Sequence, residues 1–258
     1  MNDADAFARL LASGVPVSAP VAVVVAHADD ETLWAGAALG RMTDCRLIHL
    51  TDSSPRDLAD ARRLGFRTRE AYAVARAGEL DAALVALGAA PERLGYAVPD
   101  QEAVAHLPGL VERLATDCAG VAAIATHPYE GGHPDHDAAA LAVRVAADRL
   151  GVPVVEFASY NLHGGERVWA RFEPNSDCPE NTRPLLPDER ARIDAALAAH
   201  ASQAVVFDDW RPAVERWRAA PRYDFSRPPP GEACLYDRFG WTLTSARWRE
   251  LAEAAAWR

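Results

Sequence analysis

The stretch VAVVVAHADDE, from Val21 to Glu31, decides the fold of this chain. Its first six residues form an uninterrupted run of valine and alanine, which is typical of a strand buried on both faces of a sheet. A histidine and three acidic residues follow almost at once. Polar side chains directly after a buried strand lie at its carboxyl end, where open α/β sheets bind their ligands. The stretch therefore predicts a parallel sheet with a functional loop at the end of one strand.

Further apolar runs along the chain predict the other strands of this sheet. The predicted strands cover Val21–Ala26, Cys45–Leu50, Arg93–Val98, Val121–Thr126 and Val152–Ser159. Helical patterns lie between them, at Glu31–Arg41, Thr68–Leu87, Gln101–Thr116 and Asp137–Leu150. Strands that alternate with helices at this spacing indicate an α/β fold, in which a mostly parallel sheet carries helices on both faces.

The last third of the chain differs in composition, because prolines and tryptophans become frequent there. Since no repeat or low-complexity linker separates it from the rest, we expect a single domain over residues 1–258, with a core at about 18–160 and an irregular C-terminal cap at about 161–258. The tryptophans of the cap have two interpretations, since aromatic rings either stack on sugars in an acceptor groove or seal a cap onto a core. Sealing is favoured for Trp210, Trp217 and Trp241, because Trp248 and Trp257 lie on a predicted amphipathic terminal helix.

The composition excludes several classes of function. The chain has 258 residues, with 27 basic against 37 acidic side chains and a formal net charge of −10, and this balance repels nucleic-acid phosphates and anionic membranes. All of the basic residues are arginines, so lysine-dependent phosphate loops and Schiff-base chemistry are excluded. No apolar run approaches the ~20 residues of a membrane span, and no secretory signal is recognisable. We therefore expect a cytoplasmic protein with a small-molecule partner.

Two clusters of polar residues carry the chemistry. The first is His27–Glu31, and the second is His127–Asp137, with the sequence HPYEGGHPDHD. Each follows a predicted parallel strand, so the two clusters are expected at the same edge of the sheet. Two histidines and a carboxylate with an open position suit a catalytic zinc ion, and the same set suits Fe(II). The alternative is that these residues are solvated and cap the helices that follow.

The two clusters together resemble the PIG-L/LmbE-like N-acetylglucosaminyl deacetylase family, whose members show AHPDDE and HPDH where this chain has AHADDE and HPDH. The similarity spans about Val21 to Ser159 and includes LTDSS, ARAGEL and PDQEA. Some members carry a tyrosine two residues before HPDH, a position held here by Gly131, while Tyr129 lies further upstream. The resemblance implies a zinc-dependent enzyme with a Rossmann-like core that hydrolyses the N-acetyl group of GlcNAc-containing substrates or related amides.

The resemblance also assigns roles to residues of the first cluster. His27 and Asp30 match metal ligands of the family, and His136 matches the third ligand. Asp29 matches the general base, which removes a proton from the attacking water. Because a fourth protein ligand would close the position that water needs, Asp29 and Asp30 are expected to have different roles.

Four further residues receive roles from the same resemblance. His133 matches a residue that protonates the leaving amine or stabilises the oxyanion, a step that amides need because they expel amines poorly. Asp135 is expected to orient His133 and raise its basicity. Arg76, in ARAGEL, and Asp100, in PDQEA, match positions that bind sugar hydroxyls.

Other polar residues receive structural interpretations. We expect His127 to have a structural role at the end of its strand, with contact to the site left open. Glu31 is expected to support a metal ligand or to start the helix. His49 is interpreted as a buried histidine with a satisfied partner, and His200 as a packing residue.

The sequence as a whole therefore predicts a metal-dependent hydrolase that removes the N-acetyl group from an amino sugar or glycoconjugate. Within enzymes, the alternative is an amidase that cleaves a larger amide conjugate. A non-catalytic nucleotide-binding domain is disfavoured, because no GxGxxG follows the first strand and carboxylates occupy that turn. A metal-binding regulatory module and a homo-oligomer remain open.

Overall fold

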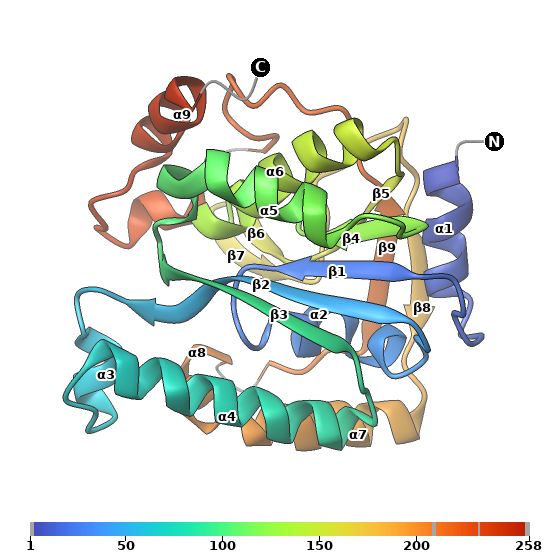
Figure 1. The fold of residues 1–258 in the computed structure, drawn as a ribbon, viewed down its shortest axis with the longest axis horizontal. Helices are drawn as coiled ribbons and strands as arrows, with labels where there is room; N and C mark the ends of the chain where they lie inside the picture. Colours follow the sequence, from blue (N-terminus) through green and yellow to red (C-terminus); the bar gives the residue numbers. More distant parts are fainter. Residues whose placement is uncertain (1–2, 208–209, 232, 256–258) are drawn as a thin grey trace.

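The computed structural model describes residues 3–207, 210–231 and 233–255, which contain a seven-stranded sheet in the order β3-β2-β1-β4-β5-β9-β8 (Figure 1). Five strands are parallel, and β9 and β8 continue the sheet in antiparallel pairing. The strands of this sheet are β1 (Val21–Val25), β2 (Cys45–Pro55), β3 (Glu92–Asp100), β4 (Ala123–Thr126), β5 (Val154–Phe157), β8 (Asn181–Pro184) and β9 (Val214–Ala219). The predicted α/β fold, with a mostly parallel sheet, is confirmed.

The central strand β1 is buried on both faces, as its run of valines predicts. Val21, Val23 and Val25 belong to one hydrophobic core, while Ala22 and Val24 belong to the other. This alternation follows from the two-residue period of a strand, which directs successive side chains to opposite faces. A strand with both faces covered therefore needs apolar residues at every position.

Helices cover both faces of the sheet (Figure 1). The core on one face includes side chains of α1 (Asp3–Ala12), α2 (Asp30–Leu39), α4 (Arg69–Leu87) and α7 (Pro187–Ala199). The core on the other face includes side chains of α5 (Leu107–Asp117), α6 (Pro134–Leu150) and α9 (Ser245–Ala254). The remaining short helices are α3 (Ala59–Arg63), α8 (Ala204–Phe207) and the 3₁₀ helices η1 (Ala103–His106), η2 (Ala201–Gln203) and η3 (Leu235–Arg238).

The C-terminal third is more regular than the predicted irregular cap. Strands β8 and β9 extend the main sheet, and α7 packs against α4. A separate hairpin forms from β6 (Tyr160–His163) and β7 (Glu166–Trp169). The sequence did not reveal β9, because three of the six residues of VERWRA are charged and charged residues are uncommon in strands. In the fold its charged Arg218 is buried together with two glutamates.

Arg218 anchors the loop that carries the second polar cluster. Its guanidinium donates from Nε to Glu156 at 3.0 Å and from Nη2 to Glu130 at 2.7 Å, and all three side chains are buried. Burial raises the pKa of Glu130 to about 8 and that of Glu156 to about 7, although the charge of Arg218 acts in the opposite direction. Two buried carboxylates therefore share one cation next to the functional loop.

This arrangement predicts a pH dependence of stability. Between the ordinary pKa of 4.5 and about 7, the folded state retains a proton on Glu156 that the unfolded chain releases, so the free energy of unfolding decreases as pH rises. We expect Glu156→Gln to flatten this decrease by about 2–3 kcal/mol between pH 5 and pH 8 in urea unfolding. Glu180→Gln, at the more exposed pair with Arg216, is the matched control. Identical pH slopes for wild type and Glu156→Gln would contradict the prediction.

Among the helices in the described part of the chain, none has the length and apolar character that crossing a membrane requires.

Candidate active site

The two polar clusters meet because their strands are neighbours. β1 pairs with β4 in parallel, so His27 and His127 follow the same edge of the sheet. The connection after β1 leads to α2 on one face, and the connection after β4 leads to α6 on the other face. A crevice opens at such a switch point in a parallel sheet. Asp100, the last residue of β3, reaches the same crevice.

The turn into α2 holds Asp29 in an unusual conformation. Asp29 has a φ of 153° and a ψ of −26°, a combination that non-glycine residues rarely adopt. Its backbone N–H donates to Glu31, and its carboxylate accepts from Arg76 Nη2 at 2.9 Å. These contacts on both its backbone and its side chain hold the strained residue at the edge of the pocket.

Asp30, the first residue of α2, lies at the centre of the cluster. Its Oδ2 accepts the backbone N–H of His27 at 2.8 Å, and its Oδ1 accepts Trp34 Nε1 at 3.1 Å. The same carboxylate lies 3.2 Å from His136 Nε2 and 3.3 Å from His127 Nε2. Burial alone would raise the pKa of Asp30, but these two histidines hold it well below its usual value. The carboxylate is therefore an anion and is available as a ligand.

Two glycines and a proline position His133 at the start of α6. A Cβ atom on Gly132 would lie 2.0 Å from the backbone oxygen of Tyr160, and Gly131 has a φ of +70°, so both positions favour glycine. Pro134 occupies the first turn of the helix, where its missing N–H costs nothing. His133 Nδ1 accepts the backbone N–H of Asp135 at 3.1 Å, which leaves the proton on Nε2.

Asp135 contacts different partners from those predicted. The interaction with His133 comes from the backbone N–H of Asp135, while its carboxylate accepts from the N–H groups of Gln101 and Ala103 and lies 3.3 Å from His27 Nε2. The carboxylate therefore joins the end of β3 to α6 and orients His27. The negative charge of Asp135 raises the pKa of His133 without a side-chain hydrogen bond between the two residues, although burial of the ring lowers this pKa more strongly.

The histidines include the donors that a metal ion would use. Ligand atoms of His27, His133 and His136 lie within 4.8 Å of one another, and so do those of Asp30, His127 and His136. The predicted set of His27, Asp30 and His136 shares two members with each group. Both ring nitrogens of the buried His136 lack a hydrogen-bond partner in the described part of the chain. An unpaired buried histidine is costly in a protein interior unless something else, such as a metal ion, binds it.

The pKa values of the titratable groups in the site shift in different directions. Burial lowers the pKa of His133 and of His136 to about 3, so both rings are neutral at pH 7. Burial also lowers the pKa of His27, but the carboxylates of Asp100, Asp135 and Asp30 together outweigh it and raise the pKa well above its usual value. Burial raises the pKa of Asp29 to about 7, against the lowering effect of Arg76. The site therefore contains two neutral histidines, His133 and His136, beside a protonated His27.

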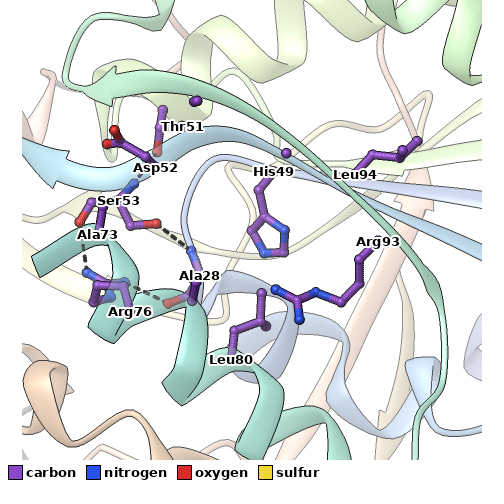
Figure 2. Close-up of a pocket in the computed structure, with 13 residues that line it drawn as sticks. Ala28, His49, Thr51, Asp52, Ser53, Ala73, Arg76, Leu80, Arg93 and Leu94 are labelled. Atoms are coloured by element: carbon purple, nitrogen blue, oxygen red, sulfur yellow. Dashed lines mark hydrogen bonds between the residues drawn. The ribbon is translucent and has the colours of Figure 1, made fainter. Parts of the chain in front are cut away.

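Arg76 lies in the wall of two cavities. One cavity, of about 370 Å³, also contains the metal-binding candidates, and the other, of about 380 Å³, lies between α4 and strands β2 and β3. Figure 2 shows Arg76 reaching the backbone oxygen of Ala28, to which it donates from Nη2 at 2.6 Å. It also donates to the Ser53 oxygen and to Asp29. The predicted contact of Arg76 with a sugar remains a prediction, because three of its hydrogen bonds go to protein.

Removing Arg76 is expected to destabilise the fold. Arg76 is 4% exposed, so Arg76→Met leaves the buried Asp29 carboxylate without its cation. We expect a loss of about 3 kcal/mol in the free energy of unfolding, measured by urea denaturation. Arg63→Met is the control, since its ion pair with Asp60 is exposed and worth about 0.5 kcal/mol. Equal losses in the two variants would show that the Arg76–Asp29 pair has no special role.

A buried cluster behind the site joins Glu31, His49 and His200, which lie far apart in the sequence. Glu31 is fully buried, with His49 Nε2 at 3.2 Å from one carboxylate oxygen and His200 Nε2 at 3.6 Å from the other. Burial would raise the pKa of Glu31, but hydrogen bonds from the two histidines lower it below its usual range. Since Glu31 also accepts the N–H of Asp29, this cluster supports the turn that carries both aspartates. No periodicity in the sequence links three such distant residues.

The tyrosine that lines the pocket is Tyr160, from β6, rather than Tyr129. The ring of Tyr160 lies 5.2 Å from that of His136. Tyr129 is buried away from the site, where its hydroxyl donates to the Arg227 backbone oxygen. His127 lies under the site and stacks on His136 at 3.8 Å.

The tryptophans of the last third have different roles. Trp217 and Trp248 are fully buried and belong to the two cores. Trp241 lines the pocket, and Trp210 packs against another pocket tryptophan, Trp169. Trp257 lies outside the described residues. The sealing role is therefore confirmed for Trp217, whereas Trp241 faces the site.

Comparison with known families agrees with the geometry of the site. Residues 22–147 match the family model described as PIG-L, GlcNAc-PI de-N-acetylase. The resemblance to the PIG-L family is confirmed. The matched PIG-L region includes both polar clusters, Arg76 and Asp100, and it ends within α6. The rest of the pocket wall, from β6 onward, lies outside this region. No curated protein matches the chain significantly by sequence.

Several solved structures share the fold at low sequence identity. The A40926 pseudoaglycone deacetylase Dbv21 has a TM-score of 0.61 and 18% identity, over 81% of this chain and 99% of its own. A deacetylase of the teicoplanin biosynthetic pathway, solved with teicoplanin, has a TM-score of 0.58 and 18% identity, over 80% and 99%. The N,N'-diacetylchitobiose deacetylase from Pyrococcus horikoshii has a TM-score of 0.51 and 15% identity, over 75% and 74%. These similarities establish the shared fold.

Proposed function

We propose that this chain is a metal-dependent N-deacetylase, which hydrolyses the acetamide of an N-acetylated amino sugar or glycoconjugate. One observation carries the proposal: the buried His136 ring makes no hydrogen bond in the described part of the chain, and its Nε2 lies 3.2 Å from the Asp30 carboxylate in a pocket that also contains Asp29. The PIG-L match over residues 22–147 and the deacetylases among the structural neighbours support this activity.

The donor set fits a divalent metal ion. Two histidine nitrogens and one carboxylate are a common catalytic set for zinc and also for Fe(II). We assign His27, Asp30 and His136 as the residues that would hold zinc, since the unpaired nitrogens of His136 and the anionic Asp30 need such a partner. When bound, zinc supplies a Lewis acid that polarises the amide carbonyl and acidifies water.

Asp29 is positioned to act as the base. Arg76 occupies one carboxylate oxygen, Oδ2, so the other oxygen is left to accept a proton from the attacking water. Burial favours this role, because an isolated carboxylate in a low-dielectric site binds a proton more strongly than one in water. The strained backbone of Asp29 directs this side chain into the pocket, and the contacts with Arg76 and Glu31 maintain it there.

His133 is positioned to serve the leaving nitrogen. Its Nε2 carries the proton and lies 3.7 Å from Asp100, whose negative charge stabilises a positive charge on the ring. Because the ring is neutral at rest, it can donate Nε2–H to the carbonyl oxygen as negative charge develops there. To serve the nitrogen instead, it takes up the proton that Asp29 has removed from the attacking water and gives a proton to nitrogen as the C–N bond breaks. Both roles agree with the resemblance.

The test is a screen of the metal-loaded protein against N-acetyl sugars and their conjugates, with separate detection of free amine and acetate. One neighbour was solved in a form described as zinc-inhibited, so the protein is assayed with one equivalent of Zn²⁺, with excess Zn²⁺ and with Fe²⁺. We expect amine and acetate in equal amounts. If amine appears only from larger amides, the protein is an amidase, and absence of acetate in every metal condition would refute the deacetylase proposal. The cytoplasmic location and the oligomeric state stay predictions from the sequence.

A further inference from the structure

The pocket of the proposed deacetylase has walls that are mostly aromatic above a polar floor. The cavity of about 370 Å³ is lined by the candidate ligands and Asp29, by polar side chains that include Gln101, Arg167 and Gln203, and by apolar side chains. Six of the apolar side chains are Tyr160, Trp169, Val206, Phe207, Phe239 and Trp241. All six lie outside the PIG-L region of residues 22–147, so the family match says nothing about what they contact.

The first wall is a rigid stack of rings. Trp169 lies 5.5 Å from Tyr160 and stacks on Trp210 at 5.0 Å with an interplanar angle of 16°. Trp34 supports the stack from below, at 6.0 Å from both Tyr160 and Trp169. Packing against Trp210 and against the Arg167 guanidinium, which lies 4.4 Å from its ring centroid, holds Trp169 in one orientation. A preorganised aromatic wall of this kind binds a ligand at little cost in conformational entropy.

The second wall lies next to the residue that serves the leaving amine. Phe239 and Trp241 are 4.9 Å apart, and Trp241 meets the ring of His133 at 5.2 Å. Phe239 is 44% exposed, as is Val206. Exposed apolar side chains that continue into a pocket are typical of a ligand-binding surface rather than of protein surface in general.

Two polar groups of the floor, Arg76 and Asp100, already contact other protein groups, while Gln101 and Arg167 also line the cavity and can contact sugar hydroxyls. Arg76 donates to Asp29 and to two backbone oxygens, and Asp100 pairs with His27. A site that discriminates between sugars by their hydroxyl groups needs polar partners for them, because an unpaired buried hydroxyl is costly. The aromatic walls offer apolar contact in addition.

From these observations we propose that the substrate is an N-acetyl amino sugar that carries a large apolar aglycone, alkyl or aryl, and that the Tyr160–Trp169 and Phe239–Trp241 walls bind this group. The inference rests on the proposed deacetylase function. The apolar group belongs to the amine side of the amide, because Trp241 contacts His133, the residue that serves the leaving nitrogen. An acetyl group on the other side needs only the small space next to the ligands.

The test compares methyl, octyl and phenyl N-acetyl-β-glucosaminides as substrates. We expect kcat/KM for the octyl and phenyl compounds to exceed that for the methyl compound by about 10- to 100-fold, since several buried apolar groups contribute. Trp169→Ala and Trp241→Ala should each lower this ratio by about tenfold, mainly through KM, while Trp241→Phe retains most of it. Val205→Ala is the matched control, because Val205 is exposed and does not line the pocket.

A second measurement separates this inference from the proposed function. The amine products, methyl and octyl β-glucosaminide, are titrated calorimetrically into the protein with Zn²⁺ bound, which requires no turnover. If the octyl amine binds more tightly than the methyl amine but no N-acetyl sugar is hydrolysed, the deacetylase proposal is refuted, while the binding of an apolar group by the aromatic walls is supported. Equal affinities and equal kcat/KM across the aglycones would overturn the inference, as would a ratio unchanged in both Trp→Ala variants. A preference for octanoyl over acetyl amides without an aglycone preference would overturn it too, since the walls would then bind the acyl side.

Discussion

Replacing Asp29 with asparagine is expected to lower kcat by about 10²–10⁴-fold, the usual effect of losing a general base, while bound metal remains stoichiometric. Asparagine keeps the shape of the side chain and an oxygen for Arg76, and among non-glycine residues it tolerates positive φ comparatively well. It cannot accept the proton of the attacking water. The measurements are steady-state kinetics and elemental analysis of the purified protein.

Two outcomes would contradict this assignment. If Asp29→Asn loses its metal while Asp30→Asn keeps it, the roles of the two aspartates are reversed. If Asp29→Asn keeps near-full activity, Asp29 is not the base. Asp148→Asn serves as the matched control, because this residue lies near the far end of α6 with a side chain that is 46% exposed.

Removing His136 is expected to abolish stoichiometric metal binding. Loss of a residue that only hydrogen-bonds a metal ligand lowers metal affinity by about 10- to 100-fold, so loss of a ligand should lower it by more than about 100-fold. Asp30 would lose its neighbour 3.2 Å away, and the remaining donors would be too few for tight binding. Metal content of His136→Ala is measured by elemental analysis after dialysis, and its fold by circular dichroism.

The control and the conservative variant keep this prediction testable. His106→Ala removes a histidine whose side chain is 49% exposed and which belongs to none of the candidate ligand groups, so this variant should retain its metal. His136→Gln preserves more of the buried volume if the alanine variant folds poorly. A full equivalent of tightly bound metal in a folded His136 variant would reject His136 as a ligand and favour the group formed by His27, Asp100, His133 and Asp135.

The fold was predictable from the sequence because its signals are local. The apolar run at Val21–Ala26 reports a strand buried on both faces, and Thr68 and Gly88 bound a helix by capping at its two ends. Hydrophobic alternation did not reveal β8 and β9, because antiparallel strands near the edge of a sheet carry polar residues that resemble loop sequence. The predicted irregular cap therefore proved to be partly an extension of the main sheet.

The sequence by itself determined the residue types of the site and their positions after two strands. Side chains that follow neighbouring parallel strands converge at one edge, so the meeting of the two polar clusters was predictable from local pattern. The choice of His27, Asp30 and His136 within these clusters came from the family resemblance. Only the tertiary structure decided which partner each of these groups contacts. The pairing of Arg76 with Asp29, the cluster of Glu31 with two histidines and the aromatic walls all join residues from distant segments. Such contacts depend on how helices and loops pack across the sheet, and no periodicity of the chain encodes that packing.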